Sequence, residues 1–213
     1  MRKPVQIGNA TLYQADCRDV LPAAADCVVT DPVWPNCPPG LLAGSERPHE
    51  LLSEALALIQ AATVVIVMGF DSDPRFLSSV PSRWPFIRSQ QLPYAVPSYA
   101  GRLLRGDEVA YAFGAIPKGK GVIPGRARAV STPKASRATG HPCPRADDHM
   151  KQLCGWWCPP GGTVLDPFMG TGATGVAAVS AGRKFVGIEI DPVYFDIACE
   201  RIERAQDQGR LFA

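Results

Sequence analysis

The chain of 213 residues carries a formal net charge of +2, 20 glycines and 21 prolines. This length suits one domain with a substantial core, and the glycine and proline content stays below the range typical of disordered chains. The longest apolar runs, such as residues 61–70, are far shorter than the ~20 residues of a membrane span, and residues 1–10 lack the apolar stretch of a signal peptide. Composition therefore argues against membrane and disordered proteins, and we expect a cytoplasmic globular protein.

The first half of the chain predicts strands alternating with helices. Residues 46–62 carry leucine, alanine and isoleucine at three- and four-residue steps, typical of an amphipathic helix. The continuous apolar run at 63–70 predicts a strand buried on both faces. The other elements expected here are strands near 10–15 and 26–30 with a short helix between them, and two antiparallel edge strands within 84–97 and 106–115.

The second half continues this alternation after a proline-broken loop at 116–139. We expect, in order, a helix at 147–158, a strand at 162–168, a loop and helix at 169–182, a strand at 184–190 and an amphipathic helix at 191–208. The pattern predicts an α/β fold with a doubly wound, mainly parallel sheet. We expect one domain over residues 1–213, with a short basic loop insertion at 116–140.

Basic residues are concentrated in the middle of the chain. Between Arg75 and Arg145 there are twelve basic residues and two acidic ones, whereas the rest of the chain is acidic overall. A long stretch of one sign suits a polyanionic partner, although solvated loop charge would look the same. The residues of the insertion that we expect to bind nucleic acid are Lys118, Lys120, Arg126, Arg128, Lys134 and Arg137.

The seven cysteines do not predict a metal site. Cys154 and Cys158 form a single loose pair, whereas structural zinc sites usually show two tight pairs. Their spacing of about one helical turn is typical of buried free thiols. We therefore expect no metal and reduced cysteines.

The segment VVTDPVWPNC (28–37) begins as a buried strand and ends in an unusual corner. The β-branched start suits a central strand. Asp31 and Pro32 then suit a turn, but Trp34 is a rare choice there unless something packs on its ring. The corner therefore predicts either a functional aromatic or a core residue.

A glycine loop follows the strand expected at 162–168. The segment VLDPFMGTGATG places Gly170, Gly172 and Gly175 before a helix, where glycines allow close approach of a ligand to the backbone. Glu189 ends the next strand, at about the spacing from which an acid reaches ribose hydroxyls. Glycine spacing alone would also allow a dinucleotide site.

The Asp166-Pro167-Phe168 start of this loop resembles instead the S-adenosylmethionine loop, D-P-F-x-G-x-G, of the DNA amino-methyltransferases. Asp31-Pro32-Val33-Trp34 resembles their second signature, [D/N/S]-P-P-[Y/F/W]. The order of the two signatures is that of the β group, a circularly permuted arrangement found in phage and prophage enzymes. HPCPRA (141–146), GDEVAYAFG (106–114) and QADC (14–17) resemble three further family segments. Val33, Arg145 and Ala146 depart from the family pattern.

The resemblance implies S-adenosyl-L-methionine as cofactor and DNA as substrate. It implies cofactor contacts for Asp166, Phe168, Gly170, Gly172 and Glu189, with Asp16 near the adenine and His141 and Arg145 near the methionine end. Asp31 and the Pro32 carbonyl would accept the two N–H bonds of an exocyclic amine. A base flipped out of the duplex would stack on Trp34.

The function expected is methyl transfer to N6 of adenine in DNA. Alternatives are a cytosine-N4 DNA methyltransferase, an RNA adenosine methyltransferase, and a non-catalytic nucleic-acid or clamp adaptor. The C-terminal Gln208, Leu211 and Phe212 have the Q-x-x-L-F spacing of peptides that bind the bacterial sliding clamp. A homodimer is also compatible with the family resemblance.

Overall fold

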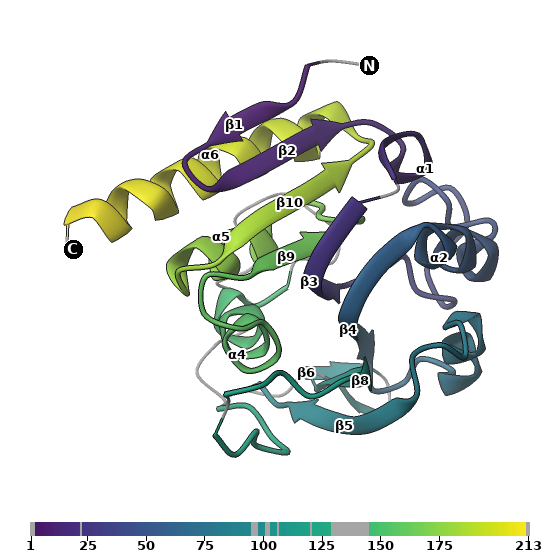
Figure 1. Cartoon of the computed structure of the whole chain (residues 1–213). Helices are drawn as coiled ribbons and strands as arrows, with labels where there is room; N and C mark the ends of the chain where they lie inside the picture. The colour runs from purple at the N-terminus through teal and green to yellow at the C-terminus, as the bar shows by residue number, and fades with distance from the viewer. Residues whose placement is uncertain are drawn as a thin grey trace.

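An eight-stranded mixed sheet forms the centre of the computed structural model (Figure 1). The structure describes residues 3–21, 23–94, 98–100, 103–105, 107–119, 121–128 and 145–211, with only the backbone at 98–100, 103–105 and 210–211. The strands lie in the order β1-β2-β10-β9-β3-β4-β8-β5. Their bounds are β1 Val5–Ile7, β2 Ala10–Gln14, β3 Ala23–Thr30, β4 Ile59–Gly69, β5 Phe86–Leu92, β8 Glu108–Gly114, β9 Thr163–Asp166 and β10 Lys184–Glu189, and a separate hairpin is made of β6 Ser98–Ala100 and β7 Leu103–Arg105.

The five central strands are parallel, and the antiparallel pairs lie toward the edges. β2, β10, β9, β3 and β4 pair in parallel, whereas β1 joins β2, and β8 joins β4 and β5, in antiparallel fashion. The prediction of a mainly parallel α/β sheet is therefore confirmed. The carboxyl ends of the five central strands meet at one edge, where ligands bind in sheets of this kind.

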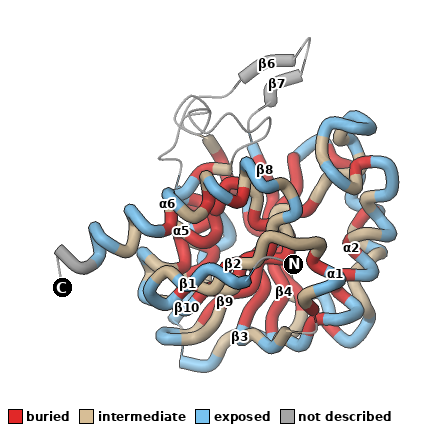
Figure 2. The backbone as a smooth tube through the Cα atoms, turned by 90° about the horizontal axis from the view of Figure 1, so that it is seen from above, coloured by how far each residue is buried: buried red, intermediate tan, exposed pale blue. Residues whose placement is uncertain are grey.

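Helices cover both faces of the sheet (Figure 1). They are α1 Cys17–Val20, α2 Pro48–Ala57, the 3-10 helix η1 Pro74–Ser79, α4 Asp147–Trp157, α5 Ala173–Ser180 and α6 Pro192–Leu211. Alternate residues of β4 enter two separate cores: Val65 and Val67 pack with α4, α5 and α6, whereas Val64 and Ile66 pack with α1, α2 and η1. This confirms a strand buried on both faces, and Figure 2 shows the buried residues concentrated in the central strands.

The main correction to the predicted elements concerns the helix expected at 46–62. The helix ends at Ala57, and β4 begins at Ile59, which pairs with Ala23 of β3. Ile59 fits the helical pattern because it is buried, but strand pairing with β3 decides its conformation. The strand β1, the hairpin β6–β7 and η1 were not predicted, and α6 extends past residue 208 to Leu211. In the described part of the chain no helix is long and apolar enough to span a membrane.

Candidate functional site at the carboxyl edge of the sheet

The predicted site residues lie at the carboxyl ends of neighbouring parallel strands. Asp31 directly follows β3, Asp166 ends β9 and Glu189 ends β10. The hydroxyl of Thr30, the residue before Asp31, donates a hydrogen bond of 2.7 Å to Asp166 Oδ1. The acidic corner and the start of the glycine loop are thus held together across adjacent strands.

Trp34 is fixed against the end of β4 by two hydrogen bonds. Its indole Nε1 donates to Asp31 Oδ1 at 2.8 Å and to the Val67 carbonyl at 3.2 Å. The ring also lies on Gly69, where an added Cβ would be 2.6 Å from Trp34 Cζ3. Trp34 is half-buried at the corner, so it is neither a core residue nor a free surface aromatic.

Arg145 bridges the corner to a second carboxylate. Its Nε donates to Asp31 Oδ2, and its Nη1 donates to Glu108 Oε1 at 2.8 Å. Its guanidinium lies over the Trp34 ring, with 4.1 Å between Cζ and the ring centroid. All these contacts are with the acidic corner and β8; the expected place of Arg145 beside the cofactor stays a prediction.

Glu108, the first residue of β8, belongs to the same cluster and was missed by sequence reasoning. The hydroxyl of Tyr94 donates to Glu108 Oε1 at 2.7 Å, and His149 Nδ1 lies 4.0 Å from Oε2. Only 6% of the Glu108 side chain is exposed. An acid that opens an otherwise apolar strand, EVAYAFG, is the signal that could have identified it.

The Asp31 carboxyl is the most strongly perturbed acid of the corner. Burial raises its pKa to about 7, against the opposing effect of the Arg145 guanidinium, and the nearby Glu108 and Asp166 add to the rise. A carboxyl with this pKa changes charge near neutral pH. It is therefore suited to accept hydrogen bonds or a proton at physiological pH.

The glycine loop has the backbone geometry that its sequence predicts. Gly170 and Gly172 have φ values of 51° and 82°, in the left-handed region that favours glycine. Gly172 precedes the first residue of α5, and the amide of Gly170 donates to Glu189 Oε2 at 2.9 Å. The acid at the end of β10 is thus in direct contact with the loop, and burial raises its pKa. Phe168, two residues before Gly170, is half-buried.

Asp166 braces the loop from inside. Its Oδ1 accepts from Thr30 and from the Phe168 amide, and its Oδ2 accepts from the Thr174 hydroxyl at 2.6 Å. Burial raises its pKa to about 6, although these three hydrogen bonds oppose the rise. With 1% exposure, Asp166 is buried beneath the loop that it holds, and a direct cofactor contact stays a prediction.

Asp16 has a clear local role at the end of β2. It caps α1, and its carboxylate accepts from the amide, Nε and Nη2 of Arg18 at 2.9, 2.9 and 2.6 Å. This ion pair lowers the pKa of Asp16, with the side-chain hydrogen bond as the main cause. Contact of Asp16 with an adenine ring stays a prediction.

The remaining predicted residues are only partly described. Lys118, Arg126 and Arg128 are exposed, and the Arg128 amide donates to Gln152 Oε1 at 2.9 Å. His141, Lys120, Lys134, Arg137 and Phe212 lie outside the described residues. Among the residues described, no cluster of histidine, cysteine, aspartate and glutamate could hold a metal ion, and Cys154 and Cys158 are buried and not joined in a disulfide.

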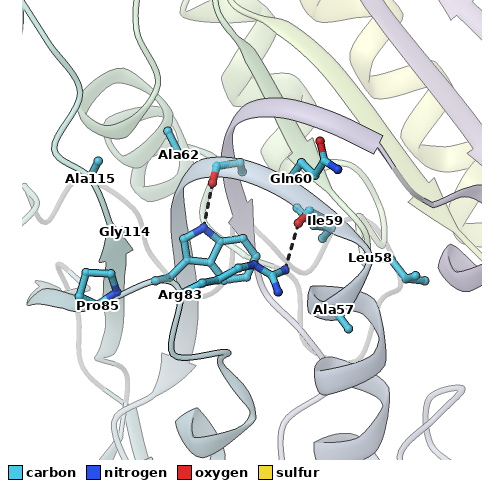
Figure 3. Close-up of a pocket in the computed structure, with 11 residues that line it drawn as sticks. Ala57, Leu58, Ile59, Gln60, Ala62, Arg83, Pro85, Gly114 and Ala115 are labelled. Atoms are coloured by element: carbon cyan, nitrogen blue, oxygen red, sulfur yellow. Dashed lines mark hydrogen bonds between the residues drawn. The ribbon is translucent and has the colours of Figure 1, made fainter.

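A hollow of about 830 Å³ lies at the opposite edge of the sheet (Figure 3). It is lined by the start of β4, the end of β8 and the Arg83–Trp84 pair. Arg83 Nη2 donates to the carbonyls of Leu56 and Ile59, Trp84 Nε1 donates to Ala61, and the guanidinium lies over the Trp84 ring. These contacts hold the end of α2 against the sheet. The guanidinium of Arg83 and the indole N–H of Trp84 therefore already have hydrogen-bond partners within the fold.

Comparison with known proteins points to one class of enzymes. Over residues 105–200 the chain matches the N6/N4 DNA methylase family. The matched range contains Glu108, Arg145, the glycine loop and Glu189. It does not reach the Asp31 corner.

Curated relatives match shorter segments. A DNA adenine methyltransferase of Escherichia coli (strain K12), YhdJ, is 38% identical over 65 residues, which are 30% of this chain and 22% of that protein. The type II methyltransferase M.Cfr9I of Citrobacter freundii is 50% identical over 44 residues, or 21% of this chain and 15% of that protein. The matched segment thus spans less than a quarter of either relative.

Solved structures match nearly the whole chain. M1.HpyAVI in complex with SAM has a TM-score of 0.70 and 23% identity, covering 91% of this chain and 98% of that one. The cytosine-N4-specific PvuII DNA methyltransferase has a TM-score of 0.61 and 15% identity, covering 96% and 93%. The fold is therefore that of the S-adenosylmethionine-dependent DNA methyltransferases.

Proposed function

We propose that this protein transfers a methyl group from S-adenosyl-L-methionine to the exocyclic N6 of adenine in DNA. The observation that carries the proposal is the hydrogen bond between Thr30 and Asp166. This hydrogen bond holds the Asp31 corner beside the glycine loop. A base bound at the corner, as methyl acceptor, would therefore lie next to a cofactor bound at the loop, as methyl donor. The match to the DNA methylase family over residues 105–200 supports the same class of reaction.

The glycine loop and its acid fit S-adenosylmethionine. The Glu189 carboxylate, within 2.9 Å of the Gly170 amide, suits the two hydroxyls of a ribose. Phe168 offers a half-buried aromatic surface. Gly172 is the N-cap of α5 and has no side chain to keep a ligand away from the backbone there. The bound cofactor would supply an electrophilic methyl group. Binding would use Phe168, Gly170, Gly172 and Glu189, with Asp16, His141 and Arg145 as further expected contacts.

The Asp31 corner supplies what an aromatic amine lacks. The lone pair of an exocyclic amine is delocalised into the ring, which makes it a poor nucleophile. Two acceptors aimed at its N–H bonds, the Asp31 carboxylate and the Pro32 carbonyl, would localise the lone pair and stabilise the charge that develops during transfer. The ring constrains Pro32, so its carbonyl needs little reorganisation. Asp31 or water would then take the proton, and Trp34 would hold the flipped base.

The proposed target base is adenine. An acid at the start of the tetrapeptide favours adenine, and the relative in Escherichia coli is named an adenine methyltransferase. The fold is shared with a cytosine-N4 enzyme, which makes cytosine the nearest alternative. The chain order, with the acidic corner ahead of the glycine loop, supports the permuted β group. A phage or prophage type is a further part of the proposal.

The proposal includes two partners beyond DNA, a sliding clamp and a second copy of the chain. Gln208 and Leu211 lie in the last turns of α6, which Figure 2 shows projecting from the body of the molecule. This end could present a Q-x-x-L-F peptide to a sliding clamp. A homodimer in the cytoplasm is compatible with the family resemblance.

The test is incubation of the protein with unmethylated DNA and S-adenosylmethionine, digestion to nucleosides and mass spectrometry, with Asp31→Ala beside the wild type. N6-methyladenine that is absent with Asp31→Ala is the expected result. N4-methylcytosine would change the base, and methylated adenosine from RNA alone would change the substrate. Tight cofactor binding with no methylated product would refute the enzyme and favour a non-catalytic adaptor.

A further inference from the structure

Arg145 makes the two contacts that the proposed function assigns to the target base. Its Nε donates to Asp31 Oδ2, and its planar guanidinium lies 4.1 Å from the centroid of the Trp34 ring. A flipped adenine would donate its amine N–H to the same carboxylate and stack on the same indole. The guanidinium also resembles the target bases chemically. Adenine and cytosine both contain a planar N=C–NH2 unit, and a guanidinium contains the same planar arrangement of a carbon bonded to nitrogens.

With Arg145 in place, each oxygen of the Asp31 carboxylate already accepts a side-chain hydrogen bond. Oδ1 accepts from the Trp34 indole at 2.8 Å, and Oδ2 accepts from Arg145. The side chains of Asp31 and Arg145 are only 17% and 12% exposed. An incoming base therefore competes with the guanidinium both for Oδ2 and for the face of the Trp34 ring.

Glu108 offers Arg145 a second position. Its Oε1 already accepts from Arg145 Nη1 at 2.8 Å, while Oε2 is buried and finds no hydrogen-bond partner among the described residues. The hydroxyl of Tyr94 holds Oε1 in place, and His149 Nδ1 lies 4.0 Å from Oε2. Guanidinium groups bind carboxylates through two parallel hydrogen bonds, so a small shift would let Arg145 engage both Glu108 oxygens.

We propose that Arg145 is a placeholder for the methyl-acceptor base: it occupies Asp31 and Trp34 when no base is bound and moves fully onto Glu108 when the base enters. This inference rests on the proposed function and extends it, because it names the residue that the base displaces and the residue that receives it. Arg145 is then a specificity-determining residue, since only a planar group with an N–H donor replaces both of its contacts.

The test uses two variants with opposite effects on the site of the base: one keeps Arg145 on Asp31 and Trp34, and the other uncovers Trp34. Glu108→Gln keeps the hydrogen bonds to Tyr94 and Arg145 but removes the charge that receives the guanidinium, so Arg145 stays on Asp31. We expect the KM for DNA to rise about tenfold or more, the difference between a charged and a neutral partner. Arg145→Lys keeps the positive charge between the carboxylates but cannot cover Trp34, and the KM for DNA should fall. Glu108→Gln, which changes no residue assigned to the cofactor, should leave the Kd for the cofactor unchanged, measured by calorimetry.

Other roles predict different results. If Arg145 and Glu108 were only structural, both variants would raise the KM, and the inference would be overturned. If Arg145 were only a cofactor ligand, Arg145→Lys would weaken cofactor binding and leave the KM for DNA unchanged, which would also overturn it. Thermal unfolding of each variant shows that it is folded.

A second measurement does not need turnover. The Nε–H resonance of Arg145, assigned in NMR spectra as the signal missing from Arg145→Lys, should shift on addition of single-stranded oligodeoxyadenylate, which offers unpaired adenine. If the wild type methylates nothing but this resonance shifts, the proposed function fails and the placeholder stands. A resonance unmoved up to millimolar oligonucleotide overturns the placeholder, whatever the activity.

Discussion

Gly69 at the end of β4 determines where Trp34 can lie. A Cβ added to this residue would be 2.6 Å from Trp34 Cζ3, 3.1 Å from Cη2 and 3.2 Å from Asp71 Oδ1. Gly69 is not among the glycines with positive φ, so its backbone tolerates alanine and only the close approach of the indole requires glycine. Gly69→Ala therefore acts on the Trp34 ring and leaves the backbone in place.

The expected effect follows from how the ring is held. Trp34 Nε1 is bonded to Asp31 and to the Val67 carbonyl, two residues before Gly69 on the same strand. The ring cannot retreat from a new methyl group without lengthening these bonds. Overpacking of this kind typically costs about 1–3 kcal/mol, so we expect Gly69→Ala to lower the free energy of unfolding by that amount. It should also lower kcat, because Asp31 loses its indole donor.

Urea denaturation followed by circular dichroism measures the change in stability. Gly155→Ala is the matched control, because nothing lies within 4 Å of a Cβ there and the residue is inside α4, where alanine is favoured by up to about 1 kcal/mol. Adding Trp34→Phe to Gly69→Ala removes the outer ring atoms and should relieve most of the clash. Additive effects of the two changes, within about 0.5 kcal/mol, would refute this account of Gly69.

Further predictions concern protonation, salt and the C-terminus. The raised pKa of Asp166, about 6, means that the folded state loses stability as the pH rises from about 4 through 6; Asp166→Asn should reduce that loss by up to roughly 3 kcal/mol in urea denaturation at several pH values. The methyl-transfer rate should rise through pH 7 as Asp31 ionises, and a flat profile between pH 6 and 8 would contradict its role. DNA affinity should fall steeply with salt, with a shallower slope after alanine replaces Lys118, Arg126 and Arg128. Purified sliding clamp should retain the full chain in a pull-down but not the chain without residues 208–213. Equal retention of both would refute clamp binding through this motif.

Much of the site could be predicted because it is local in the sequence. The glycine loop is one continuous stretch, and its positive φ values and its contact with Glu189 follow from a strand–loop–helix–strand order. The buried strand β4 could also be predicted, since a continuous apolar run of about eight residues is typical of a strand buried on both faces. The boundary between α2 and β4 could not, because Ile59 satisfies both patterns and only pairing with Ala23 decides between them.

The contacts of Arg145 could not be predicted, because they join segments that are far apart in the chain. Arg145 is 114 residues from Asp31 and 37 residues from Glu108. Sequence similarity assigned it to the cofactor by its position in one short motif. Its hydrogen bonds depend instead on how β3 and β8 lie in the sheet, which no local pattern contains.

The position of Glu108 shows why a second carboxylate was missed. Functional residues of parallel sheets are sought at the ends of strands, and Glu108 is at the beginning of one. β8, however, runs antiparallel to β4, and Glu108 pairs directly with Gly69, the last residue of β4. Because β8 is antiparallel to β4, its first residue lies at the carboxyl edge of the parallel strands, next to Gly69, on which the Trp34 ring lies. The antiparallel extension of the sheet thus supplies the charge that holds Arg145, and a search for site residues in this fold should include the starts of its antiparallel strands.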